Sequence, residues 1–167
     1  TNSLSTGTAF AVCYAENSGT NTDSTWSDSG IRLTFTAASA VSGIKYGSPT
    51  RTMTSSSAAT NRLPQATNVV VTYDGALGPA KYISLVDASL NSGNPCAQGT
   101  IAAASADSTH SGALQAGSGG KVVTIPQSPL LSDAAEFALC YASGTGDNTD
   151  TWTDSNIRVK MSKLKDL

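Results

Sequence analysis

Short runs in which apolar and polar residues alternate recur along the chain and predict β-strands. These runs lie at residues 8–15, 30–36, 68–73, 80–86, 120–126, 136–142 and 156–161, and clusters of Gly, Pro, Asn, Asp and Ser separate them. No segment of about a dozen residues carries apolar positions at intervals of three and four, so the pattern predicts no long amphipathic helix. Frequent short strands with this spacing predict an all-β protein built as an antiparallel β-sandwich.

Nearly the same sequence occurs near both ends of the chain. FAVCYAENSGTNTDSTWSDSGIRL begins at Phe10, and FALCYASGTGDNTDTWTDSNIRV begins at Phe137. Each copy is predicted to form two strands joined by a long polar loop that contains a Trp. Successive side chains of a strand point to opposite faces, and both faces of the first strand of each copy are apolar. That strand is therefore expected in the middle of a sheet, and the N-terminal hairpin is expected to repeat the C-terminal one.

The position of the two copies suggests how the chain is organised. Residues 1–36 are expected to form the N-terminal hairpin, 37–60 a Ser/Thr-rich connection, and 61–167 the main β-sandwich, of immunoglobulin-like or jelly-roll-like type. An isolated hairpin is marginally stable in water, so the first hairpin needs a partner. It packs in its own chain, docks on a neighbouring subunit, or is the end of a preceding module in a longer array.

The repeat also suggests how the three cysteines pair. In a secreted protein an odd number implies a free thiol or an intermolecular bridge. If the repeat marks the module, Cys96 and Cys140 belong to one module and are expected to form a disulfide. Cys13 corresponds to Cys140 and would need a counterpart of Cys96 outside this chain, as an inter-subunit cysteine. Alternatively, Cys13 is a small buried residue among alanines.

Catalytic chemistry is not expected from this sequence. The only histidine, His110, lies in the loop ADSTHSG with Asp107 and Ser111 nearby, but no serine lies in a nucleophile motif such as GxSxG. The acidic residues occur mainly in turns, where Asp stabilises backbone geometry. We therefore expect a protein that is not an enzyme and that needs no cofactor.

The repeated loops carry two alternative binding hypotheses. Their Asp residues are interleaved with Asn, Thr and Gly, which suits calcium, although Asx-turns explain the same residues. The second hypothesis is that a Trp in each loop stacks on a sugar ring; the alternative is that each Trp covers the end of the core with its N–H bonded to a loop carbonyl. The candidate calcium residues are Asp23, Asp28, Asp147, Asp150 and Asp154, and the candidate stacking residues are Trp26 and Trp152.

Composition narrows the range of partners. Charged residues make up 13% of the chain and the formal net charge is −2, so no basic surface is expected for nucleic acid. No apolar run reaches the roughly 18 residues that a membrane-spanning helix requires. Ser, Thr, Gly and Ala are abundant, and the sequence starts with Thr rather than Met, which together favour a processed extracellular or cell-surface protein.

The duplicated FAxCYA…TWxDSxIR segment and the composition resemble, in overall design, extracellular filament and surface-fibre protomers such as pilus subunits and microbial helical fibril subunits. The resemblance implies a structural protein that assembles with itself, head to tail, into a filament or surface layer by strand or hairpin complementation. The alternative is a carbohydrate-binding or adhesion module of a tandem-repeat surface protein, with surface glycans as partners.

Overall fold

The computed structural model of the protein describes residues 4–6, 8–44, 51–53 and 61–163. The chain divides into two compact units, Thr1–Thr36 and Ala37–Leu167. Both units consist mainly of β-strands, and most strand pairs are antiparallel, which is the all-β class predicted from the alternating pattern. Among the described residues, no helix is long and apolar enough to cross a membrane.

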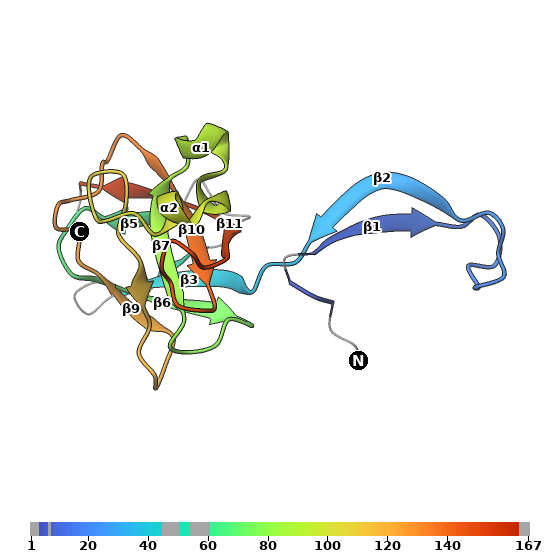
Figure 1. The fold of residues 1–167 in the computed structure, drawn as a ribbon, viewed down its shortest axis with the longest axis horizontal. Helices are drawn as coiled ribbons and strands as arrows, with labels where there is room; N and C mark the ends of the chain where they lie inside the picture. The colour runs from blue at the N-terminus through green and yellow to red at the C-terminus, as the bar shows by residue number, and fades with distance from the viewer. Residues whose placement is uncertain (1–3, 7, 45–50, 54–60, 164–167) are drawn as a thin grey trace. The chain divides into compact units, whose positions relative to one another are not determined.

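The first unit is a β-hairpin. Strands β1 (Ala9–Tyr14) and β2 (Ser27–Thr34) pair antiparallel and form a two-stranded sheet, drawn in blue in Figure 1. A polar loop joins them, as the sequence predicts. Within this unit no third described strand extends the sheet, and no second layer covers either face.

The second unit contains a five-stranded sheet, whose strands follow the order β5 (Arg62–Pro64), β11 (Trp152–Ser162), β10 (Glu136–Ala142), β7 (Tyr82–Asp87) and β8 (Leu114–Gln115). The long strands β10 and β11 form its central hairpin. The pairing of β11 with β5 is parallel, and the other pairs of this sheet are antiparallel.

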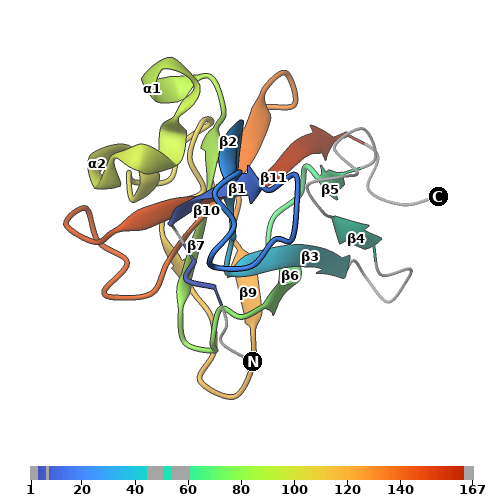
Figure 2. The same cartoon turned by 90° about the vertical axis from the view of Figure 1, so that its right-hand side faces the viewer.

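A four-stranded antiparallel sheet completes the strands of the second unit. Its order is β4 (Arg51–Met53), β3 (Ala38–Ile44), β6 (Val69–Gly75) and β9 (Val122–Ile125), and Figure 2 shows these strands side by side. Strand β6 has the burial alternation of a half-buried strand, with Val69, Val71 and Tyr73 buried. These residues join buried side chains of the five-stranded sheet in one hydrophobic core.

A smaller hydrophobic cluster lies against the other side of β10. Three short helical segments, α1 (Leu90–Gly93), η2 (Pro95–Ala97) and α2 (Gly99–Ala102), connect β7 to the strands that follow. Their residues Cys96 and Ala102 are buried together with Val86 of β7 and with small residues of β10. Strand β10 therefore has both faces covered, and this explains why both faces of its sequence are apolar.

Strands β3 and β4 lie within 37–60, the segment expected as a Ser/Thr-rich connection, and residues 45–50 and 54–60 of that segment lie outside the described part of the chain. Strand β3 pairs with β6 over most of its length, and β4 pairs with β3, so both belong to the four-stranded sheet. The run AASAVSGI is built mainly of small residues, and Ala, Ser and Gly have low strand propensity. Pairing with the strongly apolar β6 decides the structure here, and local sequence preference does not.

Candidate assembly interface of the first hairpin

The two copies of the repeated sequence form hairpins with the same register. In the first hairpin Ala11 lies opposite Arg32 and Cys13 opposite Asp28, and the register shifts between these pairs. In the hairpin of β10 and β11, the equivalent residues pair in the same way and the shift occurs at the equivalent place. The local fold of each copy therefore follows from its own sequence.

The motif Asp-Ser-x-Ile-Arg produces this shift in register. The Ser155 hydroxyl donates to the carbonyl of Leu139 across the hairpin (2.8 Å) and accepts from the N–H of Ile157 (3.1 Å). The residue between Ser155 and Ile157 is Asn156, which has a positive φ of 62°. The first hairpin has Gly30 at this place (φ 76°), and the left-handed conformation is one that Gly and Asn adopt readily.

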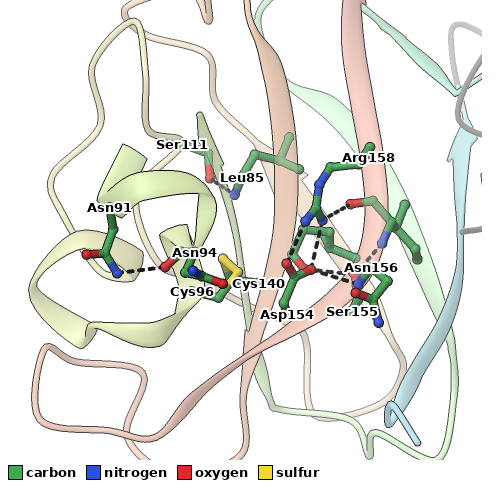
Figure 3. Close-up of a disulfide and its surroundings, with 12 residues drawn as sticks. Leu85, Asn91, Asn94, Cys96, Ser111, Cys140, Asp154, Ser155, Asn156 and Arg158 are labelled. Carbon is green, nitrogen blue, oxygen red and sulfur yellow. Dashed lines mark hydrogen bonds and ion pairs between the residues drawn. A yellow bond between two sulfur atoms is a disulfide. The ribbon is translucent and has the colours of Figure 1, made fainter. Parts of the chain in front are cut away.

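An ion pair completes the motif in both hairpins. The two terminal nitrogens of Arg158, Nη1 and Nη2, donate to the carboxylate of Asp154 at 2.8 and 2.7 Å, as Figure 3 shows. Arg32 and Asp28 repeat this two-pronged pair at 2.8 and 2.6 Å. The hydrogen bonds that Arg32 donates to Asp28 raise the pKa of Arg32, and those that Arg158 donates to Asp154 raise the pKa of Arg158. The repeat in the sequence singled out this motif, but the roles considered there for its Asp residues were calcium binding and Asx-turns, and not an ion pair.

The Trp of each loop is held by a hydrogen bond from its ring N–H to a loop carbonyl. Trp26 donates to Thr20 and Trp152 to Asp147, both at 2.9 Å. Trp152 is 6% exposed and belongs to the cluster around the disulfide, so its ring offers almost no surface to a sugar. The structure therefore assigns Trp152 to packing, and of the two candidate stacking residues only Trp26 keeps an exposed ring, at 48%.

The surroundings of the second hairpin show what this sequence packs against. On the edge of β10, strand β7 pairs with it from Phe137 to Ala142, and β5 pairs with the end of β11. One face of the hairpin enters the main core. The residues of this face, none more than 6% exposed, are Phe137, Leu139, Tyr141, Ile157, Val159 and Met161.

The opposite face of β10 packs against the short helical segments and carries the disulfide. Cys140 is bonded to Cys96 of η2, the pair expected from the sequence, and their Cα atoms are 5.4 Å apart. Ala138 and Ala142 lie on either side of Cys140 on this face and are also buried. Small residues here leave room for the segment that contains Cys96, and Figure 3 shows the disulfide that joins this segment to the strand.

The first hairpin carries a similar set of apolar side chains, and within its own unit no described strand or helix covers them. Phe10 and Val12 are partly buried, and their neighbours on the same face are between 41% and 55% exposed; these neighbours are Tyr14, Ile31, Leu33 and Phe35. The rings of Phe10 and Phe35 meet edge to face with centroids 5.7 Å apart, a contact made within the hairpin. Cys13, on the opposite face, is exposed and forms no disulfide among the described residues. The alternative of a small buried Cys13 is thus not met within this unit, and a bond to another subunit stays a prediction.

The candidate calcium residues serve as acceptors for groups of their own loops. Asp23 accepts the N–H groups of Ser18 and Gly19 on one oxygen and both the N–H and the hydroxyl of Thr25 on the other. These bonds, led by the Thr25 hydroxyl, hold the pKa of Asp23 far below its usual range.

In the loop of the second hairpin, two Asp residues accept the corresponding hydrogen bonds. Asp147 binds Thr149, whose hydroxyl contributes most to lowering the pKa of Asp147, and Asp150 accepts the N–H groups of Gly144 and Gly146. In the described part of the chain, no three His, Cys, Asp or Glu side chains gather into a group suited to a metal ion. The Asx-turn interpretation therefore accounts for these residues, and calcium binding stays a prediction from sequence.

The His110 loop forms a turn. Nδ1 of His110 lies 3.0 Å from Oδ1 of Asp107, which also accepts the N–H groups of Thr109 and His110. The hydroxyl of Ser111 accepts from the N–H of Leu85 and donates to the carbonyl of Gly112. The described contacts of Ser111 are thus to backbone groups and not to His110.

Comparison of the chain with models of protein families, with curated proteins and with solved structures gives no match. The candidate interface therefore rests on the two hairpins themselves: one sequence pattern appears twice in the chain, covered in the second unit and uncovered within the first.

Proposed function

We propose that the chain is a non-enzymatic structural protein of the extracellular space, which joins head to tail with units of its own kind into a filament or surface layer. The observation that supports this proposal is the exposure of Tyr14, Ile31, Leu33 and Phe35, whose equivalents in the second hairpin are buried. In this proposal the first hairpin is a copy of the β10–β11 hairpin that completes a β-unit other than its own.

The physical reason is the amount of apolar surface left uncovered. Monomeric proteins rarely expose a contiguous apolar face of this kind, and fully burying one large aliphatic or aromatic side chain contributes about 1.5–3 kcal/mol. Four side chains that are about half exposed would thus gain several kcal/mol in total if another layer covered them. The outer edges of β1 and β2 also carry backbone groups available for strand pairing.

We also infer that the second unit is a β-sandwich. The five-stranded and four-stranded sheets contribute to one hydrophobic core, as two facing layers do. In this architecture β10 and β11 are an internal hairpin of one layer, and β10, which is covered on both sides, has two apolar faces. A first hairpin with the same pattern is suited to the same position.

The disulfide supports an extracellular location. Disulfides persist mainly in oxidising compartments, and the Cys96–Cys140 bond lies in a buried cluster of the second unit. The charge of −2 and the small fraction of charged residues fit a surface that meets other copies with little repulsion. A role in glycan adhesion would depend on Trp26, because Trp152 is buried.

Sedimentation velocity and negative-stain imaging over a range of concentrations test the proposal. We expect the wild-type chain to associate, and the substitution Ile31→Asp to weaken association by at least about tenfold, because it places a charge in the apolar face. Asn21→Asp is the matched control: it adds the same charge in the exposed loop of the same hairpin. A wild-type chain that stays monomeric at the highest concentration would contradict the proposal.

A further inference from the structure

We propose that the first hairpin fills an acceptor site of the kind that β10 and β11 fill in the second unit, and that Cys13 then forms a disulfide with the partner. The acceptor site is the space bordered by β7, β5, the four-stranded sheet and Cys96 of η2. The partner is a β-unit equivalent to residues 37–136 of this chain, with an open acceptor site and a cysteine at the position of Cys96. The inference rests on the proposed function and names the chemistry of its interface.

The apolar face of the first hairpin matches the core side of the site. Phe10, Tyr14 and Ile31 correspond to Phe137, Tyr141 and Ile157 and are identical to them in residue type. The remaining positions of this face exchange one apolar residue for another of similar size, namely Val12 for Leu139, Leu33 for Val159 and Phe35 for Met161. Cores accept such exchanges when the total volume is kept.

One polar contact on this face also has a counterpart. The hydroxyl of Tyr141 accepts a hydrogen bond from the N–H of Ala37, which is itself buried, at 3.0 Å. Tyr14 carries the same hydroxyl and is 49% exposed. In an acceptor unit, the N–H at the start of the strand equivalent to β3 would donate to Tyr14.

The opposite face matches the helical side of the site. Ala11, Cys13 and Ala15 correspond to Ala138, Cys140 and Ala142, which lie against the segment that contains Cys96. The register places Cys13 opposite Asp28, just as Cys140 lies opposite Asp154. A hairpin docked in the same way brings the sulfur of Cys13 to the position that the sulfur of Cys140 occupies in Figure 3.

Counting hairpins and sites identifies the partner. Residues 1–167 contain two hairpins of this sequence, and their described part contains one acceptor site, which β10–β11 fills and to which it is bonded through Cys140. A second copy could accept β1–β2 at this site only by releasing its own hairpin, so in an assembly of this chain alone one hairpin for each chain would meet another copy only through its apolar face. A complete set needs one acceptor for each hairpin, and therefore an acceptor unit whose site is open.

The bond would form by ordinary thiol oxidation. The thiols of Cys13 and of the partner's cysteine lose two protons and two electrons in total. A small disulfide such as oxidised glutathione takes up both and is reduced to two thiols. The product is one S–S bond between the hairpin and the acceptor unit.

The test uses full-length chains and mass-spectrometric mapping of their disulfides after refolding in a glutathione redox buffer. In the variant Cys140→Ser, the second hairpin is no longer bonded to Cys96, and this chain's own site serves as the probe acceptor. We expect Cys13–Cys96 to be its main disulfide, within one chain or between two. Adding Ile31→Asp should lower the yield by at least about tenfold, and adding Ile31→Val should preserve it.

A second arm does not depend on the folding of the Cys140→Ser variant. During refolding of the reduced wild-type chain, Cys13 and Cys140 compete for Cys96, and a Cys13–Cys96 fraction that Ile31→Asp removes is expected. Equal yields with and without Ile31→Asp would show non-specific pairing and overturn the inference. Absence of the Cys13–Cys96 bond in both arms, or pairing of Cys13 only with Cys13 of another copy, would overturn it as well.

These outcomes are separate from those of the sedimentation experiment. Association of the wild-type chain without any Cys13–Cys96 bond would overturn this inference and leave the proposed function standing. A Cys13–Cys96 bond formed only within single chains, in a protein that stays monomeric, would support the docking of the hairpin and contradict self-assembly.

Discussion

The two hairpins of this chain have almost the same sequence and different surroundings. Ile157 of the second hairpin is fully buried, whereas Ile31 of the first is 55% exposed. Register, the shift between the pairs, the Asp–Arg ion pair and the Trp hydrogen bond are common to both. The comparison separates what a hairpin sequence produces locally from what burial by other strands adds.

The largest expected difference comes from removing a ring of the apolar face. Phe137→Ala should lower the free energy of unfolding of the second unit by about 3–5 kcal/mol, because it leaves a cavity in the core. The counterpart substitution in the first hairpin, Phe10→Ala, should change this free energy of unfolding by less than about 1 kcal/mol, because Phe10 belongs to the first unit and its ring is only partly buried. Denaturant unfolding followed by the fluorescence of Trp152, with Trp26 replaced by Phe, measures both. Equal losses would show that both hairpins are packed in a core.

A smaller difference is expected from the ion pairs. Asp154→Ala removes three hydrogen bonds, two of them from Arg158, and leaves that guanidinium partly buried without its carboxylate. We expect a loss of about 1–3 kcal/mol in the same unfolding experiment. Asp28→Ala should give no measurable change, since the pair of Asp28 and Arg32 is about half exposed on both sides. A comparable loss from Asp28→Ala would mean that the first hairpin is covered.

The smallest expected effect is a pH dependence shared by the two loops. The pKa values of Asp23 and Asp147 are lowered from the ordinary value of 3.8, mainly by the hydroxyls of Thr25 and Thr149. A lowered carboxylate pKa stabilises the folded loop fully above pH 3.8, and this contribution is lost as the pH falls through the folded-state value. Amide chemical shifts of Gly19 and Thr149, followed by NMR from pH 6 downward, should therefore change only below about pH 3.8.

Asp23→Asn and Asp147→Asn are the controls for this titration. Each substitution should abolish the acid-induced change in its own loop and leave the other loop unaffected, because the two loops belong to different hairpins. A transition near pH 3.8 or above in either loop would contradict the hydrogen-bond account of the lowered pKa.

Much of the local structure could be predicted from the sequence. All seven predicted strands are present, because their alternation and flanking turn residues act within short segments. The elements that the sequence did not predict depend on partners distant in sequence. Examples are β3, which pairs with β6, and the short helical segments, one of which is bonded to β10 by the disulfide. The Asp–Arg ion pair was not predicted, because residues four apart in a regular strand are not expected to contact each other. The two side chains meet here because the register shifts between them.

The sequence by itself determined the class of the fold, the shape of both hairpins and the pair of cysteines expected in one module. The tertiary structure alone decided that the second hairpin is covered within its own unit and that the first is not covered within its own, since the sequences of FAxCYA and its partner strand are almost identical in both places. Burial depends on the presence of an edge strand, a facing sheet and a cysteine-bearing segment, which the second unit provides around β10–β11. Hydrophobic stabilisation arises when two apolar surfaces come into contact, and the sequence of a single hairpin specifies only one of these surfaces.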